Sequence, residues 1–124
     1  MMQSNKEIAV SFLKDVSSGN VFEAYEKYAS IEFKHHNLYY KGDLISLRNG
    51  MYESQQNFPH KILEVKQIIA EGDTVMTHSH VKLKQDDLGF ILAHIFKIKD
   101  GKIIELWDFG QVIIENSPNE NGPF

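Results

Sequence analysis

Two ionisable side chains in the C-terminal part of the chain, Asp108 and His94, have types and spacing suited to proton transfer. Asp108 lies between Trp107 and Phe109 in a stretch otherwise suited to burial, and His94 lies within the apolar run FILAHIFKI. A carboxylate screened from bulk water is a better base, and a nearby imidazole can donate to an oxygen that becomes negative. Together the two groups could abstract and return a proton beside a carbonyl.

The two residues are expected on adjacent strands joined by a tight turn at Asp100-Gly101, because Asp-Gly is a strong hairpin signal. Pairing of positions across this turn places His94 opposite about Trp107, with Asp108 one step away. A β-bulge or a one-residue slip would decide whether the two side chains share a face. The alternatives are a surface or turn-capping carboxylate at Asp108 and a core histidine at position 94 with satisfied hydrogen bonds.

More polar side chains gather in the strand-rich part of the chain and on its approach. The segment KHHNLYYKGD runs from a predicted strand into a loop, where ligands are commonly held. Strand alternation places two further histidines on one face, where they either face solvent or line a site. With His35 or His36 they could bind a metal, but no spaced metal-binding motif supports this, and no metal site is predicted. The candidate ligand-binding residues in these segments are Asn37, Tyr40, His78 and His80.

Three helices are predicted in the first half of the chain. Ser4 and Glu7 have capping-box spacing ahead of apolar residues at helical intervals, and Gly19 ends this first helix. A shorter helix begins at Asn20 with the same type of signal. Apolar spacing predicts a third helix over about residues 43–54.

Strands dominate the rest of the chain. The segment IEFKHH predicts one strand, and β-branched and aromatic runs from His60 onward predict a four-stranded antiparallel meander. Helices first and strands later indicate an α+β fold, in which a curved sheet wrapped over helices would enclose a pocket. One domain accounts for residues 1–124, and residues 115–124 form a polar tail that we expect to be flexible.

The composition argues against several classes of protein. The 124 residues carry a formal net charge of −4, without the basic excess of a nucleic-acid-binding protein. The absence of cysteine excludes thiol catalysis, disulfides and cysteine metal sites. Charges interrupt the apolar residues at the start of the chain, so neither a signal peptide nor a membrane span is predicted there. We therefore expect a cytoplasmic protein with no nucleic-acid or membrane partner.

The chain resembles the SnoaL-like members of the nuclear transport factor 2 superfamily. The resemblance rests on HHN, ending at His36-Asn37; AEGDTVMTH, from Ala70 to His78; HIFKIKDGKIIELWDFGQ, from His94 to Gln111; and the closing NENGPF. It implies a cone of three helices packed on a strongly curved antiparallel sheet, with a pocket between them. It also implies a homodimer formed through the sheet.

The resemblance also implies roles for individual residues. In the polyketide cyclases of this family, an aspartate on the last long strand acts as acid and base in an intramolecular aldol closure, without metal or cofactor. Asp108 matches this aspartate, His94 matches the histidine on the preceding strand, and His36 matches the histidine at the strand end. Trp107 and Gln111 match the flanking pattern and join the candidate ligand-binding residues.

Two functions fit these residues. The first is a cofactor-independent lyase or isomerase, in which Asp108 removes a proton beside a carbonyl and His94 or His36 polarises the oxygen. A ketosteroid-isomerase-like variant would instead use a buried tyrosine as donor to the enolate. The candidate tyrosines are Tyr25, Tyr28, Tyr39 and Tyr40. The second function is a non-catalytic module whose pocket binds a small apolar or aromatic ligand.

Overall fold

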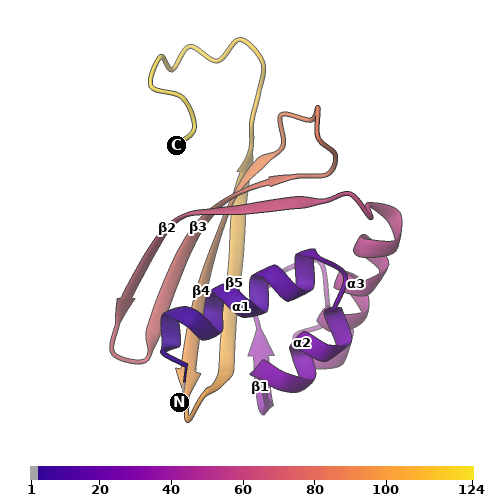
Figure 1. Ribbon diagram of the computed structural model, residues 1–124, viewed down its shortest axis with the longest axis vertical. Coiled ribbons are helices and arrows are strands. Elements are labelled where there is room, and N and C mark those ends of the chain that lie inside the picture. The colour runs from indigo at the N-terminus through magenta and orange to yellow at the C-terminus, as the bar shows by residue number, and fades with distance from the viewer. Residues whose placement is uncertain (1–2) are drawn as a thin grey trace.

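The computed structural model describes residues 3–124 and contains three helices and one five-stranded sheet (Figure 1). The helices are α1 (Asn5–Ser17), α2 (Val21–Tyr28) and α3 (Leu44–Asn57). The strands are β1 (Ala29–His35), β2 (Ile62–Glu71), β3 (Thr74–Lys82), β4 (Phe90–Lys99) and β5 (Lys102–Val112). The fold class is α+β, as predicted, and the strand order in the sheet is β1-β5-β4-β3-β2.

Local capping signals explain where α1 and α3 begin. The Ser4 hydroxyl accepts a hydrogen bond from the Glu7 N–H at 3.2 Å, and the Glu7 carboxylate accepts one from the Ser4 N–H at 3.0 Å. This is the predicted capping box, and it supplies partners for N–H groups that have none within the helix. Asp43 caps α3 by accepting from the Ser46 N–H at 3.3 Å, and α3 continues to Asn57, beyond the predicted end. Among residues 3–124, no helix is long and apolar enough to cross a membrane.

The sheet is antiparallel from β2 to β5, as predicted, and β1 adds a parallel edge. Asp100 (φ 52°) and Gly101 (φ 78°) lie in the left-handed region that a tight two-residue hairpin turn needs. β1 pairs with the first part of β5, up to His35 opposite Leu106. Beyond Leu106, β5 therefore continues past the end of β1.

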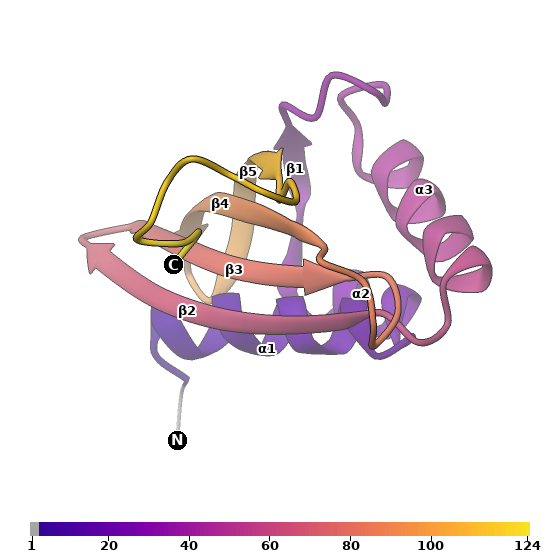
Figure 2. The same ribbon diagram turned by 90° about the horizontal axis from the view of Figure 1, so that it is seen from above.

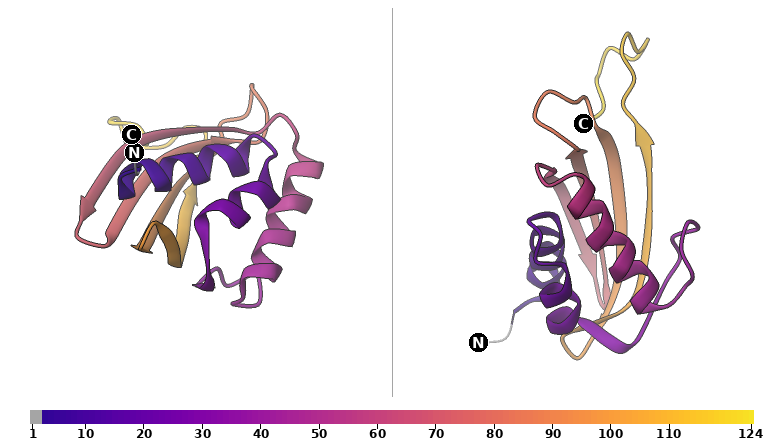
Figure 3. Two further views of the ribbon diagram at one scale, coloured as in Figure 1. Left: turned by 60° about the horizontal axis from the view of Figure 1, so that its bottom comes forward. Right: turned by 90° about the vertical axis from the view of Figure 1, so that its right-hand side faces the viewer.

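Helices α1 and α2 cover one face of the curved sheet, and the C-terminal segment runs over the opposite face (Figure 2). We term these the inner face and the outer face. α1 packs on β2 and β3, while α3 packs on α2 and β1 and stands beside the sheet (Figure 3). The buried core lies between the helices and the inner face, where Phe12 packs edge-on against Tyr25 and Phe96.

The strand register aligns two rows of residues across β2, β3, β4 and β5, one row on each face. The inner row consists of Ile68, Thr77, His94 and Asp108. The outer row consists of Ile69, Met76, Ile95 and Trp107. Because successive side chains on a strand point to opposite faces, a shift of one residue on each strand separates the two rows.

Candidate active site

An irregularity of the β-bulge type between Lys97 and Ile98 brings Asp108 opposite His94. It shifts the pairing of β4 with β5 by one residue, so that His94 no longer faces Trp107 as the sequence predicted. Side chains directly opposite each other in antiparallel strands have Cβ atoms about 4.5–5.5 Å apart. The carboxylate and the imidazole are therefore neighbours on the inner face.

The imidazole of His94 is buried, with 7% of the residue exposed, and its ring stacks on Phe96 at 5.7 Å between centroids. Burial lowers the pKa of His94 to about 4, and the Asp108 carboxylate opposes this shift less strongly. The ring is therefore neutral at pH 7. Its Nδ1 is enclosed and has no hydrogen-bond partner among residues 3–124. Because an unpaired buried N–H is costly, this favours the tautomer with the proton on Nε2.

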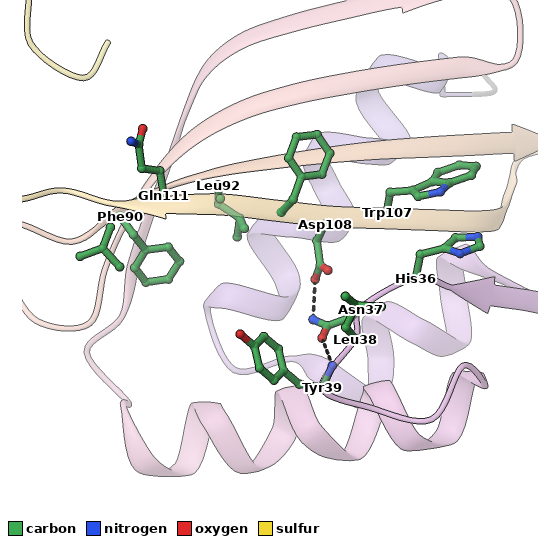
Figure 4. Close-up of a pocket in the computed structure, with 12 residues that line it drawn as sticks. His36, Asn37, Leu38, Tyr39, Phe90, Leu92, Trp107, Asp108 and Gln111 are labelled. Carbon is green, nitrogen blue, oxygen red and sulfur yellow. Dashed lines mark hydrogen bonds between the residues drawn. The ribbon is translucent and has the colours of Figure 1, made fainter.

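The carboxylate of Asp108 is held by the loop that follows β1. Asn37 donates from Nδ2 to Asp108 Oδ2 at 3.0 Å, and its Oδ1 accepts from the backbone N–H of Tyr39 at 3.0 Å (Figure 4). A backbone N–H can only donate, so the orientation of the Asn37 amide is determined. Within the part of the chain that the structure describes, Asp108 Oδ1 has no hydrogen-bond partner, which leaves it available to a ligand.

A pocket of about 580 Å³ borders β5 where this strand continues past the end of β1. Its walls come from β5, from the start of β4 and from residues 36–39. Leu92 and Phe90 point to the same side of the sheet as Asp108, and Tyr39 lies beside α3 (Figure 4). The pocket thus combines an apolar wall with one carboxylate.

His36 lies at the rim of this pocket and does not reach Asp108 from the inner face. Its Nε2 is 2.6 Å from Glu105 Oε2, and its ring stacks on Trp107 at 4.8 Å between centroids. Both contacts are on the outer side of β5. The structure therefore brings His94 to Asp108, and it does not bring His36 there as the resemblance to the SnoaL-like proteins implied. Trp107 and Gln111 also line the pocket from the outer side.

The other two predicted histidines, His78 and His80, lie on the outer face of β3 and not in the pocket. Their rings are 5.3 Å and 4.9 Å from the ring of Phe124, between centroids. Strand alternation instead turns Thr77 and Ser79 to the inner face, where both are fully buried. No group of three or more His, Asp or Glu side chains within residues 3–124 is arranged to hold a metal ion.

Tyr40 also differs from its predicted position in the pocket. Its ring packs on α3 at Gly50, where an added Cβ would lie 2.3 Å from Tyr40 Cε1. This contact explains why a glycine stands inside the helix.

Among the tyrosines considered as donors, Tyr25 is buried. Burial, and to a lesser extent the negative charge of Asp108, raise the pKa of its hydroxyl. Tyr25 therefore lies within electrostatic reach of Asp108 and stays protonated.

His35 is a site residue that the sequence analysis considered only as an alternative metal ligand. It is 5% exposed, and its two ring nitrogens contact the backbone of Asn37 and Lys41. The signal available in the sequence is the pair His35-His36 at a strand end. Alternation requires one of the two to face inward, and the structure shows that it is the first.

Neither a family model nor a curated protein matches the chain. Solved structures match its fold. AclR from Streptomyces galilaeus, whose suggested activity is that of a hydroxylase, is 20% identical with a TM-score of 0.72, over 90% of this chain and 91% of that one. A suggested polyketide cyclase from Bacillus cereus ATCC 10987 is 19% identical with a TM-score of 0.73, over 85% of this chain and 72% of that one.

A third similar structure is an NTF2-like protein of unknown function from Cytophaga hutchinsonii ATCC 33406. It is 12% identical with a TM-score of 0.72, over 90% of this chain and 93% of that one. At such identities the likeness concerns the fold and leaves the reaction open. The chain shares its fold, three helices packed on a curved sheet, with this NTF2-like protein.

Proposed function

We propose that the protein is a cofactor-independent enzyme that uses acid/base chemistry on a small carbonyl compound, by enolisation or by aldol cyclisation. The observation that supports this most is the Asp108 carboxylate in a largely apolar pocket wall, directly opposite the buried, neutral His94. Both reactions begin with removal of a proton beside a carbonyl. The apolar walls of the pocket favour a small apolar or aromatic carbonyl compound as the ligand.

In the first step, Asp108 Oδ1 takes the proton from the carbon beside the carbonyl. The electrons of the C–H bond form the C=C bond of the enolate, and the carbonyl π electrons move to oxygen. His94 is not among the residues that line the pocket, and its position opposite Asp108 makes its Nε2–H a donor to this oxygen when the ligand reaches in beside the carboxylate. A neutral imidazole can act in this way without first losing a proton.

The second step depends on the reaction. In enolisation, the proton on Asp108 returns to carbon, at the original or at a conjugated position. In aldol cyclisation, the enolate carbon attacks a second carbonyl of the same molecule, a C–C bond forms, and the new alkoxide takes the proton from Asp108. Asp108 ends as a carboxylate in both cases, so the cycle is closed.

Two neighbours support these steps. Asn37 donates to Asp108 from a neutral amide, which orients the carboxylate without neutralising it. Tyr25 has a protonated hydroxyl within electrostatic reach of Asp108 and is a second candidate donor to the enolate oxygen.

The decisive experiment is the exchange of α-protons for deuterium in a panel of small aliphatic and aromatic ketones, followed by proton NMR. Asp108→Asn is the matched control, since the amide oxygen of the new side chain can take the place of Oδ2 and accept from Asn37 while the base is lost. We expect the exchange rate to fall by at least about 100-fold in this variant. Equal rates in the native protein and the variant would sink the proposal. Saturable binding of a ketone without exchange would favour the non-catalytic binding module.

We also propose that the protein forms a homodimer through the outer face of the sheet. The outer row is apolar on all four strands, and its Ile69 is 61% exposed. Phe109, on the same face of β5, is 52% exposed. Contact between two such faces would remove these side chains from water.

A further inference from the structure

We propose that His35 is a positioning residue that holds the Asp108 carboxylate in place through Asn37. The inference rests on the proposed role of Asp108 as base, whereas the contacts that carry it are independent of any reaction. His35 is the last residue of β1, and its imidazole is buried. The loop of residues 36–43 folds around this ring before α3 begins.

The two ring nitrogens of His35 have partners of opposite kind. Nδ1 accepts from the backbone N–H of Asn37 at 3.1 Å, and Nε2 lies 2.6 Å from the carbonyl oxygen of Lys41. An N–H can only donate and a carbonyl oxygen can only accept. The proton must therefore be on Nε2, and the neutral ring satisfies both backbone groups at once.

The backbone of His35 holds the same loop. Its N–H donates to the carbonyl oxygen of Gly42 at 3.3 Å, beside the bridge between Lys34 and Asp43. The end of the loop at Lys41 and Gly42 is thus held by the His35 backbone N–H and by Nε2. The beginning of the loop, at Asn37, is held by Nδ1. Because both ends depend on one residue, the ring determines the path of the loop between them.

Asn37 transmits this position to Asp108. Its backbone N–H is held by His35 Nδ1, its Oδ1 by the Tyr39 N–H, and its Nδ2 donates to Asp108 Oδ2. A continuous series of hydrogen bonds therefore runs from the Lys41 carbonyl through His35 and Asn37 to the carboxylate. A displacement of about 1 Å at a reacting group can reduce a rate by about 100-fold, so the loss of one link matters.

Two substitutions of His35 separate its two ring contacts. The amide of His35→Asn places an acceptor near the position of Nδ1, so it can keep the bond to the Asn37 N–H. The longer His35→Gln places an amide donor near the position of Nε2, so it can keep the bond to the Lys41 carbonyl. Only the first variant should preserve the link to Asp108.

The measurements are NMR spectra of the ¹⁵N-labelled protein. In the native protein, we expect long-range couplings of the His35 ring to show the proton on Nε2. We expect the side-chain amide protons of Asn37 to keep their native shifts in His35→Asn and to move in His35→Gln. The α-proton exchange rate should fall about tenfold or more in His35→Gln only.

Each outcome decides the proposal. A proton on Nδ1 in the native protein, or equal effects of the two variants on the Asn37 amide, would overturn the positioning role. The tautomer measurement needs no variant, so it decides even if a substitution prevents folding. Absence of α-proton exchange in the native protein would refute the proposed reaction, and the NMR comparison would still decide whether His35 positions Asn37.

Discussion

The inner and outer faces of the sheet both carry histidines on the same strands, and these histidines differ in environment rather than in residue type. Histidines occur on both faces: His94 faces inward, while His78 and His80 face outward. The outward rings lie against Phe124 and are partly exposed, whereas His94 is enclosed opposite Asp108. Enclosure, rather than the presence of an imidazole, is therefore what keeps one of these rings neutral beside Asp108 and suited to donate a hydrogen bond to an enolate oxygen.

The largest expected effect that tests this difference is a fall in the free energy of unfolding at acid pH, caused by the buried His94. Its pKa is about 4 in the folded protein, against 6.5 for an ordinary histidine. Between these values the unfolded chain binds more protons, so the free energy of unfolding rises with pH. Above about pH 6.5 both states are neutral at His94 and the effect is absent; as the pH falls towards about 4, the free energy of unfolding drops by an amount on the order of 3 kcal/mol.

Urea unfolding at several pH values between about 7.5 and 4.5 measures this loss. His94→Gln should reduce the loss by most of that amount, because the group that becomes charged on unfolding is removed. His78→Gln, which removes an imidazole from the outer face, should keep the native pH dependence. If both variants retain the same slope as the native protein, His94 is not held neutral by burial.

Local sequence signals predicted most of the elements on which the two rows depend. The capping box at Ser4 and Glu7 and the turn at Asp100-Gly101 are satisfied within a few residues, so no distant contact is needed to find them. The parallel pairing of β1 with β5 was missed, because it joins strands separated by α3 and three other strands. Such a contact leaves no local signal.

The site itself depended on single-residue register, which the sequence does not reveal. The irregularity between Lys97 and Ile98 exchanges Trp107 for Asp108 as the residue opposite His94. A second irregularity in the pairing of β1 lies just before the two adjacent histidines, and His35 rather than its neighbour turns inward. One added residue in a strand turns every following side chain to the opposite face of the sheet. Alternation alone could therefore identify the candidate site residues, but not which residues lie opposite them.

The next effect concerns Thr77, which lies beside His94 in the inner row and is fully buried. Its hydroxyl has no hydrogen-bond partner within the described residues, 3–124. Thr77→Val replaces this hydroxyl with a methyl group of similar shape, so we expect the free energy of unfolding to rise by about 1 kcal/mol. Valine also suits a strand. Urea unfolding at neutral pH measures the change.

Ser79→Ala is the companion variant, because Ser79 is also fully buried and its hydroxyl also lacks a partner among the residues described. Its gain should be smaller, since alanine leaves space that valine at position 77 fills. A loss of stability in Thr77→Val would contradict the expectation. It would show that the Thr77 hydroxyl has a partner in solution, for which His94 Nδ1 and a buried water are the candidates.

Substitution of Ile69, in the outer row, should have the smallest effect on stability. It should nevertheless change the mass of the protein in solution from that of a dimer to that of a monomer. Because this side chain is 61% exposed, Ile69→Glu should change the free energy of unfolding by no more than about 0.5 kcal/mol. The same change would place two carboxylates in an apolar interface, so we expect sedimentation to give the monomer mass of 14.3 kDa. Ile31→Glu, at a fully exposed isoleucine outside the outer row, should leave the dimer intact. If the native protein already sediments as a monomer, the outer face does not associate, and its apolar row must be explained in another way.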